Sequence, residues 1–177
     1  MLQLWKRYDH EQFAFPSFGS VPMFSLSTED RRSFTNENFK GKTTIVDFIF
    51  TTCAGPCPLM SGHIQELQHT MQNQTNVQFV SFSVDPETDT PEVLAEYAQR
   101  FGAIKDRWIF LTGEKKNIYD LIHTGFHLAV DADSNAIAHS TKFVLVDKDA
   151  AIRGYYDSEG DSSLTQLIHD VKLLAKE

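Results

Sequence analysis

The sequence has few positive charges, few cysteines and no long hydrophobic run. Its 177 residues contain 16 Lys and Arg against 24 Asp and Glu, a formal net charge of −8, and no basic cluster. Nucleic acid is therefore not an expected partner, because phosphate binding needs a cationic face. No apolar run approaches the roughly 18–20 residues of a membrane span. The first residues also lack the basic and apolar segments that are typical of a signal peptide.

Two cysteines are too few for a disulfide scaffold. A composition of 41% hydrophobic and 23% charged residues excludes whole-chain disorder. The length predicts a single domain, since domains commonly contain about 100–200 residues. Within it, residues 1–40 are expected to be an aromatic extension that folds over the core, with a small hairpin formed by 24–26 and 33–35. Residues 41–177 are then the main domain.

Strand-like and helix-like patterns alternate after residue 41. Residues 43–50 and 77–84 are nearly continuous in apolar side chains, as in strands buried on both faces. A helix is expected to follow each strand, with Thr90 and Pro91 starting the second helix. Further strands are expected at 108–112, 142–147 and 152–156, and further helices at 114–122 and 164–174. This order predicts an α/β fold, a thioredoxin-like three-layer sandwich with helices on both faces of a central mixed sheet.

Both cysteines lie on the turn between the first buried strand and the following helix. The segment 48–58 reads FIFTTCAGPCP, in which three residues separate Cys53 from Cys57. Pro58 is expected at the first helical position, which places Cys57 at or near the N-cap. The positive end of the helix dipole then favours the Cys57 thiolate, the form that attacks disulfides and binds metals. We therefore interpret the turn as a functional site rather than a structural disulfide.

The spacing of the cysteines leaves two chemistries open. A redox dithiol of the thioredoxin kind has two intervening residues, whereas a longer turn lets both sulfurs point at one ion. A third ligand from elsewhere would complete a trigonal site. Thiolates with an imidazole favour Cu(I), and Zn(II) is the usual competitor.

The turn resembles the Cys-x-x-x-Cys-Pro motif of the Sco/SenC family of copper-binding proteins. The resemblance covers roughly residues 24–176. The other segments that carry it, in the family's order, are VDF at 46–48, SVDPETDT at 83–90, LTG at 111–113 and HS at 139–140 before FVLVD at 143–147.

The resemblance implies a thioredoxin-like domain that binds one copper ion, as Cu(I) or Cu(II), through Cys53, Cys57 and His139. It also implies a role in assembling the binuclear copper centre of cytochrome c oxidase, by delivering copper to the copper-centre subunit or by reducing its cysteines. Family members are usually tethered by an N-terminal membrane helix and face the periplasm, the cell exterior or the mitochondrial intermembrane space. An extracytoplasmic location and membrane contact only through such an anchor are therefore expected.

Two places depart from the family pattern. Many members carry an acidic residue between the cysteines and another before the histidine. This chain has Ala-Gly-Pro at 54–56 and Ala138 instead. The less acidic surroundings bear on copper affinity and on the choice of partner.

Three acidic residues are candidates for supporting roles. Asp85 and Asp89 follow a buried strand and are expected at the sheet edge that carries the cysteine turn. They either position the site or form a turn and a helix cap. Asp47 lies within an apolar strand, where it is either a buried proton acceptor for the thiols or an edge residue that points outward.

The remaining candidate ligands have simpler interpretations. His63 lies on or near the apolar face of the first helix, which is typical of a histidine at the edge of the core. His123 and His127 are expected to be solvated. Met60 and Met71 follow helical core spacing, which argues against a thioether copper site.

The sequence predicts a copper metallochaperone first and a thiol–disulfide oxidoreductase second. The metallochaperone would transfer copper by stepwise ligand exchange, and a Cys53–Cys57 disulfide would abolish binding. In the oxidoreductase, one thiolate attacks a partner's disulfide and the other resolves the mixed disulfide; only this activity would make the protein an enzyme. His139 discriminates between the two, because oxidoreduction needs no imidazole. A pure binding module would instead have inert, oxidised cysteines. A thiol peroxidase ranks last, because its Pro-x-x-x-Thr-x-x-Cys motif needs Pro and Thr where this chain has Val46 and Phe50 before Cys53.

Overall fold

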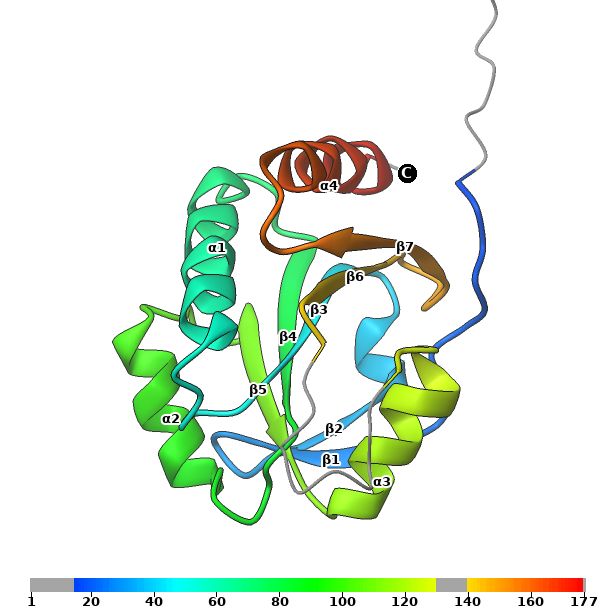
Figure 1. Ribbon diagram of the computed structural model, residues 1–177. Coiled ribbons are helices and arrows are strands. Elements are labelled where there is room, and N and C mark those ends of the chain that lie inside the picture. Colours follow the sequence, from blue (N-terminus) through cyan, green and yellow to red (C-terminus); the bar gives the residue numbers. More distant parts are fainter. Residues whose placement is uncertain (1–14, 130–139, 177) are drawn as a thin grey trace, which may run out of the picture.

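The computed structural model describes residues 15–129 and 140–176 as an α/β sandwich around one mixed sheet of seven strands (Figure 1). The strands lie in the order β2-β1-β5-β4-β3-β6-β7. They are β1 (Ser25–Thr28), β2 (Ser33–Thr35), β3 (Thr43–Ile49), β4 (Val77–Ser83), β5 (Trp108–Thr112), β6 (Lys142–Val146) and β7 (Ile152–Asp157). The helices are α1 (Pro56–Thr70), α2 (Pro91–Arg100), α3 (Lys115–Asp120) and α4 (Asp161–Leu174), with short η1 (Asn36–Phe39) and η2 (Leu121–Gly125).

The centre of the sheet consists of β3, β4 and β5, which run parallel. Every residue of β3 and β4 is buried, as expected for apolar strands that are covered on both faces. β6 runs antiparallel to β3, with Val144 opposite Val46, and β7 continues beyond it. The start of β6 therefore lies at the same end of the sheet as the end of β3.

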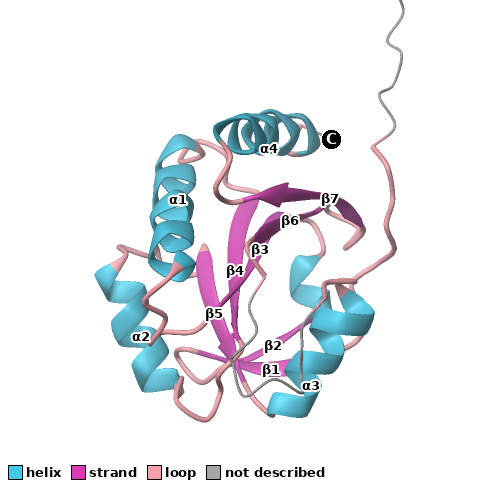
Figure 2. Cartoon of the chain, in the orientation of Figure 1, coloured by secondary structure: helices cyan, strands magenta, loops and turns pink. Residues whose placement is uncertain are grey.

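Helices cover both faces of the sheet (Figure 2). α1, α2 and α4 pack on the face that carries Ile45 and Ile49 of β3. α3 and the two short helices pack on the opposite face, which carries Val46 and Phe48. These layers confirm the predicted α/β sandwich. Among the described residues, no helix has the length and apolar character needed to cross a membrane.

The aromatic segment before β3 forms part of the sheet. β1 and β2 pair antiparallel, and β1 also pairs with β5. A side-chain contact strengthens this attachment, because Phe110 N donates to Glu29 Oε2 at 3.0 Å. The pair therefore extends the edge of the sheet instead of folding over the core. The division of the chain at residue 40 stays a prediction.

The helix starts show which local signals were correctly interpreted. Thr90 caps α2, accepting a bond from Val93 N at 3.4 Å, and Pro91 takes the first helical position as predicted. The prediction that Pro58 starts the first helix was wrong, because Pro56 takes that position. The expected helix at 114–122 is α3 followed by a π-helical turn, η2.

Candidate dithiol and metal site

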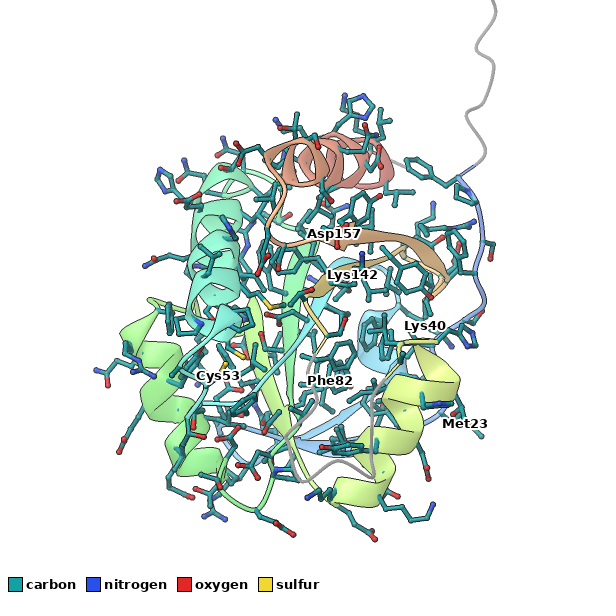
Figure 3. All side chains as sticks on the ribbon, viewed as in Figure 1. Met23, Lys40, Cys53, Phe82, Lys142 and Asp157 are labelled. Carbon is teal, nitrogen blue, oxygen red and sulfur yellow. The ribbon has the colours of Figure 1, made fainter. Side chains whose placement is uncertain are left out.

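The cysteine turn joins the end of β3 to the start of α1, at the carboxyl end of the parallel strands. The chain folds back there, and Cys53 N donates to Phe50 O at 3.2 Å. Gly55 is the N-cap, with φ −102° and ψ −122°, and Pro56 follows it, where a missing N–H costs nothing. Cys57 therefore lies in the first turn of α1. Figure 3 shows Cys53 where the chain enters this helix, on the side of α2.

The two thiols lie against each other in the protein interior. Cys53 has 8% of its surface exposed and Cys57 has none. Both are free thiols, joined by a side-chain hydrogen bond. Cys57 also has a hydrogen bond with the backbone of Phe50. The structure therefore brings Cys53 and Cys57 together as predicted, with Cys53 as the more accessible of the two.

The Cys57 thiol is a weaker acid than the sequence suggested. Burial is the main cause that raises its pKa to about 12, and the hydrogen bond with Cys53 adds to the effect because it favours the protonated Cys57 thiol. The backbone hydrogen bond from Phe50 lowers the pKa but is outweighed. The expectation that the helix dipole favours thiolate was therefore wrong for the reduced protein, because desolvation of the sulfur dominates. Cys57 must lose a proton when its sulfur binds a metal or attacks another sulfur.

Asp47 is buried beside this dithiol. It lies on the same face of β3 as Ile45 and Ile49 and has no exposed surface. Desolvation raises the pKa of Asp47 to about 7, and its charge contributes to the raised pKa of Cys57. A hydrogen bond with Ser81 on the adjacent strand lowers the pKa of Asp47 but is outweighed by burial. The outward-pointing interpretation of Asp47 was therefore wrong, and its role as a proton acceptor stays a prediction.

Asp89 is fully buried and bonded to the residues around the turn. Its Oδ1 accepts from Thr51 Oγ1 at 2.5 Å, and both oxygens lie 3.2–3.3 Å from Thr51 N. Its Oδ2 accepts from Ser83 Oγ at 2.6 Å. Asp85 is also buried, and its amide donates to Ser83 Oγ at 3.1 Å. Both acids therefore lie at the edge of the sheet that carries the cysteine turn, and Asp89 contacts the turn directly.

Sequence reasoning did not identify Thr51 and Ser83. Both are hydroxyl residues at the carboxyl ends of adjacent parallel strands, next to an acidic loop, and that combination is the signal that could have found them. Sequence reasoning also missed a second buried hydrogen bond, 2.8 Å long, between Ser61 Oγ on α1 and Tyr97 OH on α2.

Close to Thr51, a pocket of about 290 Å³ opens toward α2; its lining consists of Thr51, Val93, Glu96, Tyr97 and Arg100.

The third expected ligand, His139, lies outside the described residues. Among the described residues, no group of three His, Cys, Asp or Glu side chains could hold a metal ion. His63 is half-buried at the edge of the core, and His123 and His127 are exposed, as predicted. Met60 and Met71 are buried core residues, also as predicted.

Comparison with known proteins places the chain in a family. A family model described as SCO1/SenC matches residues 17–176. The SCO1 protein homolog of Bacillus subtilis is 31% identical over 166 residues, which cover 92% of this chain and 86% of that protein.

Solved structures agree with this match in sequence and in fold. A SCO1/SenC family lipoprotein from Bacillus anthracis has a TM-score of 0.81 at 32% identity, covering 89% of this chain and 95% of that one. BsSco, a member of the Sco family of cytochrome c oxidase assembly proteins in which a disulfide switch was identified, has a TM-score of 0.80 at 30% identity, covering 92% and 97%. Arabidopsis thaliana ScoI with copper bound has a TM-score of 0.73 at 25% identity, covering 86% and 98%. With its thioredoxin-like sandwich and its dithiol turn, the chain belongs to the SCO1/SenC family.

Proposed function

We propose that this protein is a copper metallochaperone that holds one copper ion through Cys53, Cys57 and His139. The observation that carries the proposal is the pair of contacting thiols on the turn between β3 and α1. Thiolate sulfur is a soft ligand and suits Cu(I). The bound copper in Arabidopsis ScoI supports a copper role for the same fold.

The topology of the sheet supports His139 as the third ligand. β6 begins at Lys142, three positions after His139 in the sequence. The register of β6 against β3 brings the start of β6 to the end of the sheet where the cysteine turn lies. The segment that leads into β6 therefore meets the sheet at the end that carries the dithiol. An imidazole and two thiolates would complete a trigonal copper site.

The state of the thiols would control loading and release of copper. Both protons must leave the sulfurs when copper binds, so that binding releases protons. Oxidation to a Cys53–Cys57 disulfide removes both thiolates and would release the metal. We assign the copper-centre subunit of cytochrome c oxidase as the recipient, because BsSco belongs to a family of cytochrome c oxidase assembly proteins. We also assign the protein to the outer side of a membrane, since its Bacillus anthracis relative is a lipoprotein.

A second candidate function is reduction of the recipient's cysteines. The disulfide switch in BsSco and the contact between the two thiols both favour it. Cys53 is the more exposed thiol and would attack the partner's disulfide, releasing one partner thiolate and forming a mixed disulfide. Cys57 would then attack Cys53 sulfur, releasing the second partner thiolate and leaving a Cys53–Cys57 disulfide. The pocket between Thr51 and α2 offers the partner chain a place to lie near the cysteine turn.

Anaerobic titration of the reduced protein with Cu(I) against a competing chelator tests the first function. We expect one equivalent to bind tightly, Cys53→Ser to abolish this binding and His139→Ala to weaken it strongly. His123→Ala serves as the matched control, because His123 is exposed on η2 and is expected to leave binding unchanged. Weak binding that is indifferent to His139, together with an accessible Cys53–Cys57 redox couple, would favour the reductase instead.

A further inference from the structure

The carboxylate of Asp89 is fully buried. Asp89 has no exposed surface, and it forms no ion pair within the described part of the chain. A buried charge is costly unless hydrogen bonds replace its water shell. The bonds that do so come from Thr51 and Ser83 alone among the described residues. The hydrogen bonds that compensate the burial of this carboxylate therefore come from the cysteine turn and from the end of β4.

The bonds from Thr51 to Asp89 hold the residue that follows Phe50, whose backbone contacts both cysteines. Phe50 O accepts from Cys53 N, and the Phe50 backbone is hydrogen-bonded to the Cys57 thiol. Thr51 is the next residue, and both its amide and its hydroxyl donate to Asp89. Thr51 N and Phe50 O belong to one peptide group, so fixing Thr51 fixes the carbonyl that accepts from Cys53 N. The bond to Cys57 comes from the amide of Phe50, in the preceding peptide group, so Phe50 connects the held peptide to the second thiol.

Asp89 itself is held by a rigid frame. It lies in the connection between β4 and α2, and its amide donates to Asp85 O at 2.8 Å. Ser83, the last residue of β4, fixes the second carboxylate oxygen. The carboxylate therefore links the turn to the adjacent strand and to the start of α2.

Helix capping does not account for this arrangement. The side chain that caps α2 is Thr90, which accepts from Val93 N. None of the hydrogen bonds to the Asp89 carboxylate comes from an amide of α2. The alternative in which the acids form a turn holds for the backbone of Asp89, which bonds to Asp85 O, but Asp89 does not cap α2 and its side chain bonds to the cysteine turn.

We propose that Asp89 is a positioning residue for the dithiol, acting through Thr51. It holds the turn in the geometry in which both sulfurs can bind one ion or form one disulfide. The part of this inference that concerns copper rests on the proposed metallochaperone function. The part that concerns disulfide formation stands without copper, because it depends only on the two thiols.

Three variants separate the hydrogen bonds from the shape of the side chains. Thr51→Val keeps the branched shape but removes the hydroxyl donor, whereas Thr51→Ser keeps the donor. Asp89→Asn keeps the size of the acceptor but replaces one oxygen with a donor group that faces hydroxyl and amide donors. Tyr156→Phe is the control, because it removes a buried bond of similar kind, Tyr156 OH to Asp170 Oδ2 at 2.7 Å, between β7 and α4.

Two equilibria report on positioning, and thermal unfolding of each variant reports on stability. The first is Cu(I) affinity against a competing chelator. We expect it to fall about tenfold in Thr51→Val and Asp89→Asn, the size of effect seen when residues that orient metal ligands are changed. The second is exchange with glutathione, in which two glutathione molecules reduce the protein disulfide and leave as glutathione disulfide. We expect both variants to shift this equilibrium toward the dithiol, because less well positioned thiols form a weaker disulfide.

The control variants define the outcome that overturns the proposal. Thr51→Ser is expected to match the wild type in both equilibria. Tyr156→Phe is expected to lower the unfolding temperature and leave both equilibria unchanged. The proposal is overturned if Thr51→Val and Asp89→Asn keep wild-type copper affinity and glutathione exchange but lose stability as Tyr156→Phe does. Asp89 would then have a purely structural role. If the wild type itself binds copper no better than Cys53→Ser, the metallochaperone function fails, and glutathione exchange alone decides on positioning.

Discussion

Two acidic groups near each other in the core, Asp47 and the Cys57 thiol, have raised pKa values in the folded protein. Both side chains have no exposed surface, and desolvation is the largest cause of each raised pKa. The charge of Asp47 also contributes to the raised pKa of Cys57. The reduced site therefore keeps the Cys57 proton at neutral pH, and chemistry at that sulfur must begin with its loss.

Asp47→Asn is expected to flatten the pH dependence of stability. The native pKa of Asp47 is about 7, above an unfolded value of about 3.9. Between these values the native state binds a proton that the unfolded state has released, so wild-type stability falls as pH rises through this window. At about 1.4 kcal/mol per pKa unit, the loss approaches about 4 kcal/mol by pH 7.5. Urea unfolding at pH 4 and pH 7.5 measures it.

An amide in the core changes the free energy of unfolding at both pH values alike. The difference between the two pH values therefore isolates the effect of Asp47 ionisation. Asp120→Asn is the control, because Asp120 is an exposed residue of α3. We expect this control to follow the wild type at both pH values. Equal pH dependence in wild type and Asp47→Asn would show that Asp47 ionises normally and would contradict the assignment.

The two thiols are expected to differ in reactivity. Cys57 has no exposed surface and a pKa raised to about 12, whereas Cys53 has 8% of its surface exposed. Because only the thiolate is nucleophilic, Cys53→Ser, which retains Cys57, should react with iodoacetamide at pH 8 at least about tenfold more slowly than Cys57→Ser. Mass spectrometry of the reduced proteins gives both rates. Faster alkylation of Cys57 than of Cys53 would reverse their assigned roles in disulfide exchange.

At the scale of elements, α1 and α2 are linked by a buried polar contact next to the dithiol. Ser61 on α1 and Tyr97 on α2 share a hydrogen bond of 2.8 Å, and neither side chain is appreciably exposed. Burial raises the pKa of Tyr97 well above its usual range, so that the phenol stays neutral. The bond holds the helix that begins at the cysteines against its neighbour.

Removing either partner of this bond should destabilise the protein. Tyr97→Phe leaves the Ser61 hydroxyl buried without its partner and is expected to cost about 1–3 kcal/mol. Ser61→Ala should have a similar cost, and the double variant should cost less than the sum of the two because no unpaired group remains. Urea unfolding of the wild type and the three variants gives the free energies of this double-mutant cycle. Strict additivity would show that the two hydroxyls do not interact.

The elements themselves were largely predictable, and the exceptions have physical causes. The runs at 43–50 and 77–84 became β3 and β4, because continuous apolar, β-branched segments suit a strand covered on both faces. The start of α1 was placed two residues late, since two prolines compete for the first helical position and only the fold selects Pro56. The π-helical turn at the end of α3 left no recognisable signal in the sequence.

At the scale of the whole molecule, the sheet brings distant segments of the chain together. Asp89 lies 38 residues from Thr51 in sequence, yet the two side chains are bonded. The motif located the cysteines and the acids in the sequence, and the parallel order of β3 and β4 placed them at one edge. Protonation of the thiol could not be predicted, because it depends on burial that only tertiary packing creates. Thr51 escaped notice for the same reason.

X-ray absorption at the copper edge of the Cu(I)-loaded protein tests the central claim most directly. The account predicts two sulfur ligands and one nitrogen ligand around copper, with the nitrogen lost in His139→Ala and retained in His123→Ala. A copper shell that contains only sulfur and is unchanged by His139→Ala, or one without sulfur, would contradict the three-ligand site.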